Sequence, residues 1–291
     1  MFFLLIVVLT NTFLSILFKL FPKYNINRLQ AIVVNYWTCV ITGSICLGNI
    51  SINTQSLHSE WLPWALMMGV GFIGIFNLIA YSTKIDGITT TTIANKLSLV
   101  IPVTLSVILY HETLNATEII GIALALPAVY LTTRVKDEKK KNQHLFIPIL
   151  LFFLSGSLDS FVKYVEQRFL TTPDVQAAFS IHAFAAAGTI GTILITILAL
   201  AGKMKLHWRN IVAGICIGIP NYFSIYLFIR LLHSHFMDSA AAIPVTNIGI
   251  VVTSSIVAIL LFKEKITIPR FIGLALAIIA ILLIALNGRT I

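Results

Sequence analysis

Long apolar runs follow one another along the whole chain, and short polar breaks separate them. Most runs are close to the roughly 20 apolar residues that a helix needs to cross a bilayer. The strict alternation typical of strands is not seen, and in lipid each segment must satisfy its own backbone hydrogen bonds. We therefore predict an all-α membrane protein with ten transmembrane helices, near residues 2–20, 29–48, 62–82, 88–110, 116–133, 146–165, 177–201, 211–232, 239–262 and 268–287.

An internal duplication lies within these runs. The stretch from Asp86 to Ala125 recurs without gaps 152 residues later. Four polar or glycine positions coincide at this offset: Asp86 with Asp238, Asn95 with Asn247, Glu112 with Glu264, and Gly121 with Gly273. Because five helices per repeat is an odd number, the second repeat would enter the membrane from the opposite side. We predict two inverted repeats, residues 2–134 and 146–288, joined by a charged linker, residues 135–145.

Composition agrees with a lipid environment. Hydrophobic residues make up 58% of the chain and charged residues only 11%, whereas about a quarter of the residues of a soluble domain are charged. Fifteen Lys and Arg residues belong to the side that holds the connections after the odd-numbered helices, and four to the other side. The positive-inside rule then places the first side in the cytoplasm and both termini outside. The net charge of +9 is thus a signal of topology and of contact with anionic lipid head groups, not of nucleic acid.

Other functional classes lack their residue patterns. No nucleotide-binding loop or metal-ligand spacing is found, and Cys39, Cys46 and Cys216 all fall inside predicted helices, where they fit as small packing residues. Met1 is followed directly by Phe-Phe-Leu-Leu without a basic region, which favours a retained first helix over a cleaved signal peptide. We expect no cofactor, no metal and no enzymatic activity.

The repeat unit carries a family resemblance. In each copy a tight turn with an acidic residue precedes a long apolar helix, a Glu follows at its far end, and a glycine opens a Gly-x-Ala-Leu-Ala helix at Gly121 and Gly273. This pattern resembles the paired EamA domains of the drug/metabolite transporter superfamily over essentially the whole chain. The resemblance implies a multi-pass protein of the plasma (inner) membrane that moves small solutes, most often outward, as in efflux.

Lys96 is the least expected charge in the chain. It lies about eight residues into the fourth predicted helix, which at about 1.5 Å per residue is roughly 12 Å from that end. A charge at this depth costs at least about 2.5 kcal/mol and persists mainly where it faces a cavity or a partner. We predict that Lys96 binds an anionic group of the substrate, with Asn95 adding a hydrogen bond. Snorkelling to the interface, or pairing with a buried acid, is the structural alternative.

Asp159 is the predicted proton-coupling residue. It lies about two-thirds through the sixth predicted helix, where a carboxylate can take up and release a proton as a cavity opens and closes. Lys163 follows four residues later on the same helix face. An intrahelical ion pair that makes both charges tolerable is therefore an equal alternative.

Further polar and aromatic residues are candidates for the wall of a substrate cavity. A histidine such as His182 can titrate near physiological pH, but a histidine in a membrane helix is more often a hydrogen-bonded packing residue. Each of the others serves equally well as a helix-to-helix hydrogen bond. Besides Lys96, Asn95 and His182, the predicted substrate-binding residues are Asn35, Trp37, Tyr81, Tyr222 and Asn247.

Taken together, these features predict a secondary transporter for a small organic metabolite or toxic compound, working by alternating access and coupled to protons. Its expected partners are the small-molecule substrate and the lipid bilayer; a homodimer is left open and nucleic acid is excluded. The alternative is a non-transporting scaffold or regulatory subunit, in which Lys96 and Asp159 would be paired in a dry interior. A membrane enzyme would need a catalytic group of residues, and none is found at recognisable spacing.

Overall fold

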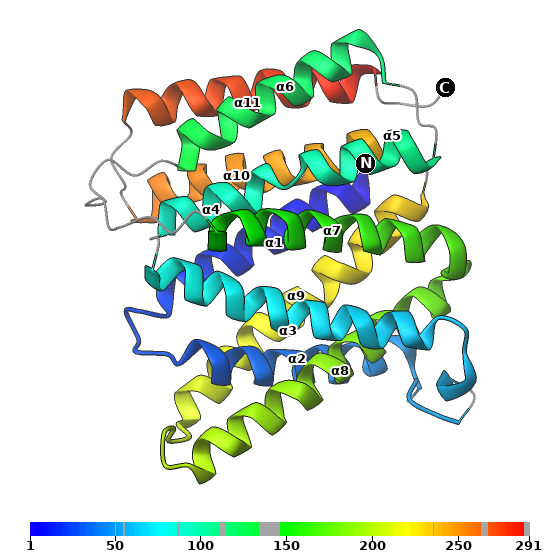
Figure 1. Cartoon of the computed structure of the whole chain (residues 1–291), viewed down its shortest axis with the longest axis vertical. Coiled ribbons are helices and arrows are strands. Elements are labelled where there is room, and N and C mark those ends of the chain that lie inside the picture. The colour runs from blue at the N-terminus through cyan, green and yellow to red at the C-terminus, as the bar shows by residue number, and fades with distance from the viewer. Residues whose placement is uncertain are drawn as a thin grey trace. The chain divides into compact units, whose positions relative to one another are not determined.

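The computed structural model describes residues 1–49, 51–54, 56–85, 88–110, 114–133, 146–234, 236–262 and 267–287. Within these ranges every regular element is a helix (Figure 1). Asp86, Glu112, Glu264 and the predicted linker 135–145 lie outside the described residues.

The helices coincide closely with the predicted apolar segments. Eight segments of the described chain are long and apolar enough to cross a membrane, and two further apolar helices are shorter. The all-helical, multi-pass class is therefore confirmed, while ten crossings in two inverted repeats stay a prediction. In chain order the elements are α1 (Phe2–Leu20), α2 (Arg28–Leu47), η1 (Ser56–His58), α3 (Leu62–Ile85), α4 (Ile88–Leu97), α5 (Val100–Tyr110), α6 (Ala116–Thr133), α7 (Phe146–Phe169), α8 (Pro173–Leu200), α9 (Trp208–His233), α10 (Ser239–Phe262) and α11 (Ile268–Asn287).

The fourth predicted segment differs, because it is interrupted between α4 and α5. Pro102 has no backbone N–H, so it cannot donate to the carbonyl of Ser98 four residues earlier. Ile101 donates to that carbonyl instead, at 3.0 Å, and Leu99 donates to the carbonyl of Lys96 at 3.5 Å. These tighter bonds span three residues instead of four. The helix is thus interrupted directly after Lys96 and Leu97.

The chain forms two compact units, and each contains parts of both sequence repeats. Unit 1 comprises Met1–Val8, Ile75–Lys163 and Leu231–Ile291, and unit 2 comprises Leu9–Gly74 and Tyr164–Arg230. The sequence repeats and the compact units therefore divide the chain differently.

In unit 1, α6 and α11 lie side by side (Figure 1). Two glycines at equivalent positions of the repeats permit this approach. A Cβ atom on Gly121 would come within 2.7 Å of Ile284, and one on Gly273 within 2.5 Å of Thr132. Helix α5 packs on α10 in the same unit.

In unit 2, α2 packs along α8. A Cβ atom on Gly191 of α8 would lie 2.5 Å from the side chain of Val33 on α2, so the absence of a side chain lets the two helices approach closely. In both units, helices that would occupy corresponding places in the two predicted repeats thus pack against each other.

Candidate functional site

Four of the predicted site residues meet beside the break between α4 and α5, in unit 1. Asp159 on α7 interacts electrostatically with Lys96 at the end of α4, and its carboxylate is hydrogen-bonded to the side chain of Asn247 on α10. The side-chain amide of Asn95 donates to the Ser155 hydroxyl of α7 at 2.9 Å. Three helices therefore place Lys96, Asp159 and both asparagines in one polar cluster, which we call the break site.

Helix α7 supplies one face of the break site. Ser155 and Asp159 are four residues apart in α7, so they lie on the same side of the helix. Between them, Gly156 allows the close approach, because a Cβ atom there would lie 2.6 Å from the carbonyl oxygen of Ser98. The Ser98 hydroxyl in turn donates to the carbonyl oxygen of Asn95 at 2.6 Å.

Gly156 and Ser98 also belong to this site, although neither was among the residues predicted from the sequence. A glycine inside a helix costs about 0.5–1 kcal/mol relative to alanine, and Gly156 lies between two polar residues of α7, which is the signal that could have singled it out. Ser98 lies four residues before Pro102, which has no N–H to donate to the Ser98 carbonyl, and this spacing is the signal for Ser98.

The break site combines one cationic and one anionic group with neutral hydrogen-bonding groups. Lys96, Asp159, Asn95 and Asn247 are partly exposed, whereas Ser98 and Ser155 are buried. An ammonium group can bind a carboxylate or a phosphate, and a carboxylate can bind a proton or a cation. The site therefore offers both an anion-binding group and a proton-binding group within one cluster.

Asn35 and Tyr222 belong to unit 2, where they are 2% and 1% exposed. The oxygen of the Asn35 amide accepts a hydrogen bond from the Asn221 amide at 3.1 Å, and the Cys39 thiol lies 3.6 Å from the same oxygen. Tyr222 stacks on Tyr226 with ring centroids 5.7 Å apart. These residues form a packed polar junction between α2 and α9.

His182 of α8 has defined partners in unit 2. Its Nε2 atom lies 3.0 Å from the hydroxyl of Ser56 in η1, and its Nδ1 atom donates to the carbonyl of Ala178 at 2.8 Å. The ring of Trp61 meets the imidazole edge-on, with centroids 5.0 Å apart. In this structure His182 therefore fastens the segment between α2 and α3 to α8.

The remaining two predicted residues lie apart from these clusters. Trp37 of α2 is exposed and donates from its indole N–H to the Thr192 hydroxyl at 2.9 Å. Tyr81 of α3 is 53% exposed and belongs to unit 1. Among the described residues, no group of three or more His, Cys, Asp or Glu is arranged to hold a metal ion.

Part of the chain is similar to a known protein family. Residues 1–134 match the EamA-like transporter family. This match includes Asn95 and Gly121 of the first copy of the repeat, in agreement with the predicted resemblance.

Full-length similarity extends to a bacterial relative and to a solved structure. The chain is 25% identical over 287 residues to a Haemophilus influenzae protein named "Uncharacterized protein", covering 96% of this chain and 95% of the relative. A solved structure titled "Crystal structure of protein" matches with a TM-score of 0.73 at 14% identity, covering 99% of this chain and 96% of that one. At this identity the second match shows the fold alone.

Proposed function

We propose that this protein is a secondary transporter of the plasma membrane. It exports a small organic metabolite or toxic compound by alternating access, and Asp159 takes up and releases the coupling proton. The observation that carries the proposal is that Lys96 and Asp159 are both partly exposed and lie in one polar cluster beside the interrupted helix, instead of in a dry interior. Ionisable groups at membrane depth mark transport pathways, and transporter sites are typically formed at discontinuous helices.

Lys96 determines the chemistry of the substrate. An ammonium group binds carboxylate or phosphate, and the amide groups of Asn95 and Asn247 add neutral hydrogen bonds nearby. We therefore propose a substrate that carries at least one anionic group. Its site is the break site, where Lys96 and both amides remain partly exposed.

Competition for Lys96 determines whether the proton and the substrate move in the same direction or in opposite directions. A substrate anion and the Asp159 carboxylate both interact favourably with the same ammonium group. Protonation of Asp159 removes its charge and leaves Lys96 to the substrate. For a purely anionic substrate, proton and substrate then travel in the same direction, and export is driven by the outward gradient of the substrate itself.

A zwitterionic substrate would reverse this relation. Its ammonium group would compete with the proton for Asp159 while its anionic group binds Lys96. Proton and substrate would then move in opposite directions, and the inward proton gradient would drive export. The direction of proton movement relative to substrate movement therefore indicates which charges the substrate carries.

The test is transport in sealed vesicles containing the purified protein. We expect uptake of at least one member of a panel of small anions and zwitterions to respond to a pH gradient. Asp159→Asn should abolish this response. Asp174→Asn, the same chemical change at an exposed position near the start of α8, is the matched control and should retain it. The proposal would be overturned if the uptake of every tested compound were unaffected both by the pH gradient and by Asp159→Asn.

Alternating access between inverted repeats is part of this proposal. It is supported by the packing of equivalent helices, α2 with α8, α5 with α10 and α6 with α11. The alternative of a non-transporting scaffold is not favoured, because the matched family is one of transporters.

A further inference from the structure

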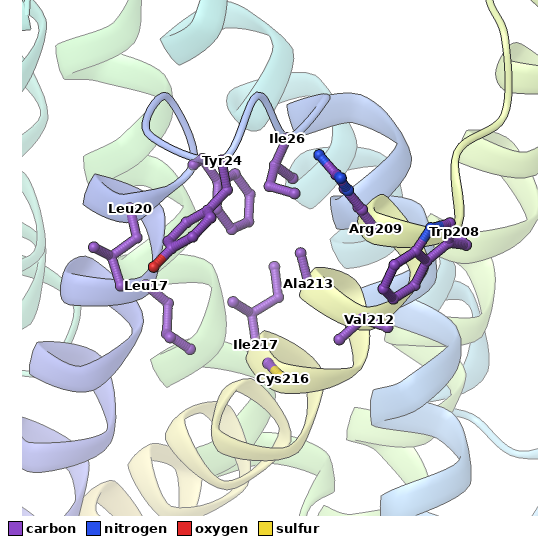
Figure 2. A pocket seen from close by; sticks show the side chains of 11 residues that line it. Leu17, Leu20, Tyr24, Ile26, Trp208, Arg209, Val212, Ala213, Cys216 and Ile217 are labelled. Atoms are coloured by element: carbon purple, nitrogen blue, oxygen red, sulfur yellow. The ribbon is translucent and has the colours of Figure 1, made fainter.

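An apolar groove of about 410 Å³ lies between the end of α1 and the start of α9, within unit 2. Figure 2 shows Leu17 and Leu20 of α1 on one side of it and Val212 of α9 on the other. The groove runs along the sides of the two helices near their ends. This is the part of a membrane helix that lies in the outer hydrocarbon layer.

A second, polar pocket of about 610 Å³ adjoins this groove. The two share Phe21 and Ile26, so their walls are continuous. The polar pocket is lined by segments that lie beyond the helix ends, including Asn25, Lys203 and Lys205. Segments beyond a helix end lie at the depth of the lipid head groups.

The loop that carries Lys203 and Lys205 is fixed in place by buried polar groups. The amide of Asn210 on α9 donates to the side-chain oxygen of Gln30 on α2 at 2.6 Å, and the amide of Gln30 donates to the carbonyl of Lys205 at 2.8 Å. The side-chain oxygen of Asn210 accepts from the backbone N–H of Asn27 at 3.0 Å. Gln30 and Asn210 are both buried. These hydrogen bonds hold the backbone around the polar pocket in place, and we call Gln30 and Asn210 the frame of this pocket.

Aromatic side chains lie where the groove meets the polar region. Trp208 is 70% exposed and Tyr24 55% exposed, and Figure 2 shows both beside the groove together with Arg209. Tryptophan and tyrosine are enriched at the boundary between hydrocarbon and head groups. Their position indicates that the apolar groove faces acyl chains and that the polar pocket faces head groups.

Charge complementarity selects the occupant. Arg209 lines the groove, and Lys203 and Lys205 line the polar pocket, while none of the described lining residues of either is acidic. We propose that the groove and the pocket together bind one anionic phospholipid, with an acyl chain in the groove and its phosphate near Lys203, Lys205 and Arg209. A free phosphate would leave the apolar groove empty. A lipid without net charge would leave the charges of the three cations without a matching negative charge.

Trp208 provides the measurement, because phospholipids with brominated acyl chains quench a tryptophan that they contact. The purified protein is placed in vesicles that contain equal fractions of brominated phosphatidylglycerol or brominated phosphatidylcholine. The Trp208 signal is the difference between the wild-type protein and Trp208→Phe. We expect the phosphatidylglycerol to bind at Trp208 at least twofold more strongly than the phosphatidylcholine.

The variant Lys203→Gln/Lys205→Gln/Arg209→Gln should lose this preference. Lys19→Gln, which removes one positive charge from α1 outside both linings, should keep it. If the triple variant does not fold, Lys203→Gln and Lys205→Gln are tested singly. Both side chains are exposed, and the frame uses only the backbone of Lys205.

Three outcomes would overturn the proposal. Equal quenching by the two lipids would show that no anionic head group is selected. Retention of the preference by the lysine and arginine variants would show that these cations do not select it. Loss of the preference on adding soluble glycerol 3-phosphate would identify a site for free phosphate instead of a lipid.

Discussion

Asn95 and Asn247 occupy equivalent positions in the two sequence repeats, and both side-chain amides bind the same helix. Asn95 donates to Ser155 of α7, and Asn247 is hydrogen-bonded to Asp159 one turn further along α7. Two halves of the chain thus place equivalent residues around one helix. The equivalence ends at the next position, because Lys96 corresponds to Ile248, so only the first repeat contributes a charge.

The two asparagines should differ in their effect on pH dependence. Asn247→Ala removes a hydrogen bond from the ionisable carboxyl group of Asp159, so we expect the midpoint of the pH profile of transport to change. Asn95→Ala removes a bond to the neutral Ser155 and should leave that midpoint in place while lowering the rate. The measurement is initial uptake into vesicles from about pH 5 to 8, the range in which a perturbed carboxyl or a histidine titrates. Equal midpoints in both variants would contradict an ionisable role for Asp159.

Lys96 and Asp159 should depend on each other energetically. Lys96→Gln leaves the carboxylate of Asp159 without its cation, and Asp159→Asn leaves the ammonium without its anion. We expect each single change to destabilise the protein, and the double variant Lys96→Gln/Asp159→Asn to lose less than the sum of the two. The coupling energy should lie within about 0.5–3 kcal/mol, the range for residues that share one polar network. Unfolding in detergent measures it, and strict additivity would show that the two charges do not interact.

Gly156 should tolerate no side chain. The Cβ atom of Gly156→Ala would lie 2.6 Å from the Ser98 oxygen and from Ile101, so α7 must move away from the break. Overpacking of this kind costs typically about 1–3 kcal/mol, and transport should fall with stability. Gly74→Ala is the matched control, because nothing lies within 4 Å of its Cβ position in helix α3. Alanine should be neutral or slightly stabilising there. Equal thermal unfolding of the two variants would contradict close packing at Gly156.

The frame of Gln30 and Asn210 should show the cost of an unsatisfied buried group. Asn210→Ala leaves the buried side-chain oxygen of Gln30 without its strongest donor, which costs about 1–3 kcal/mol. Replacement of both partners, Gln30→Leu/Asn210→Leu, removes both side-chain amides together. The Lys205 carbonyl and the Asn27 N–H lose a partner in the single and the double variants alike, so the double variant should cost less than the sum of the two single leucine variants. Thermal unfolding distinguishes the two. A double variant at least as unstable as the sum of the single leucine variants would contradict this account.

Much of the helical architecture is visible in local sequence. The segments 2–20 and 239–262 were predicted with the boundaries of α1 and α10, because bilayer thickness determines how long an apolar run must be. The break before Pro102 also has a local cause, a missing N–H. Helix α7 continues to Phe169 instead of ending near Val165, because the boundary drawn from hydropathy does not count the polar last turn.

The identity of contacting residues could not be predicted in the same way. Sequence spacing offered Lys163 as the neighbour of Asp159, yet the partners found in the structure are Lys96 and Asn247. His182 was placed in a membrane helix, but its partner Ser56 belongs to a segment between helices. Such contacts depend on how distant helices pack, and packing is decided by small residues such as Gly156, whose role is visible only once the opposing helix is known.

The sequence by itself thus determined the lipid environment, the helical class and the internal duplication, because each depends on the length, polarity and order of local segments. Only the tertiary structure decided which polar groups meet at the break site and which cations surround the groove beside Trp208. Those relationships join residues far apart in the chain, and no local pattern encodes the distance between them.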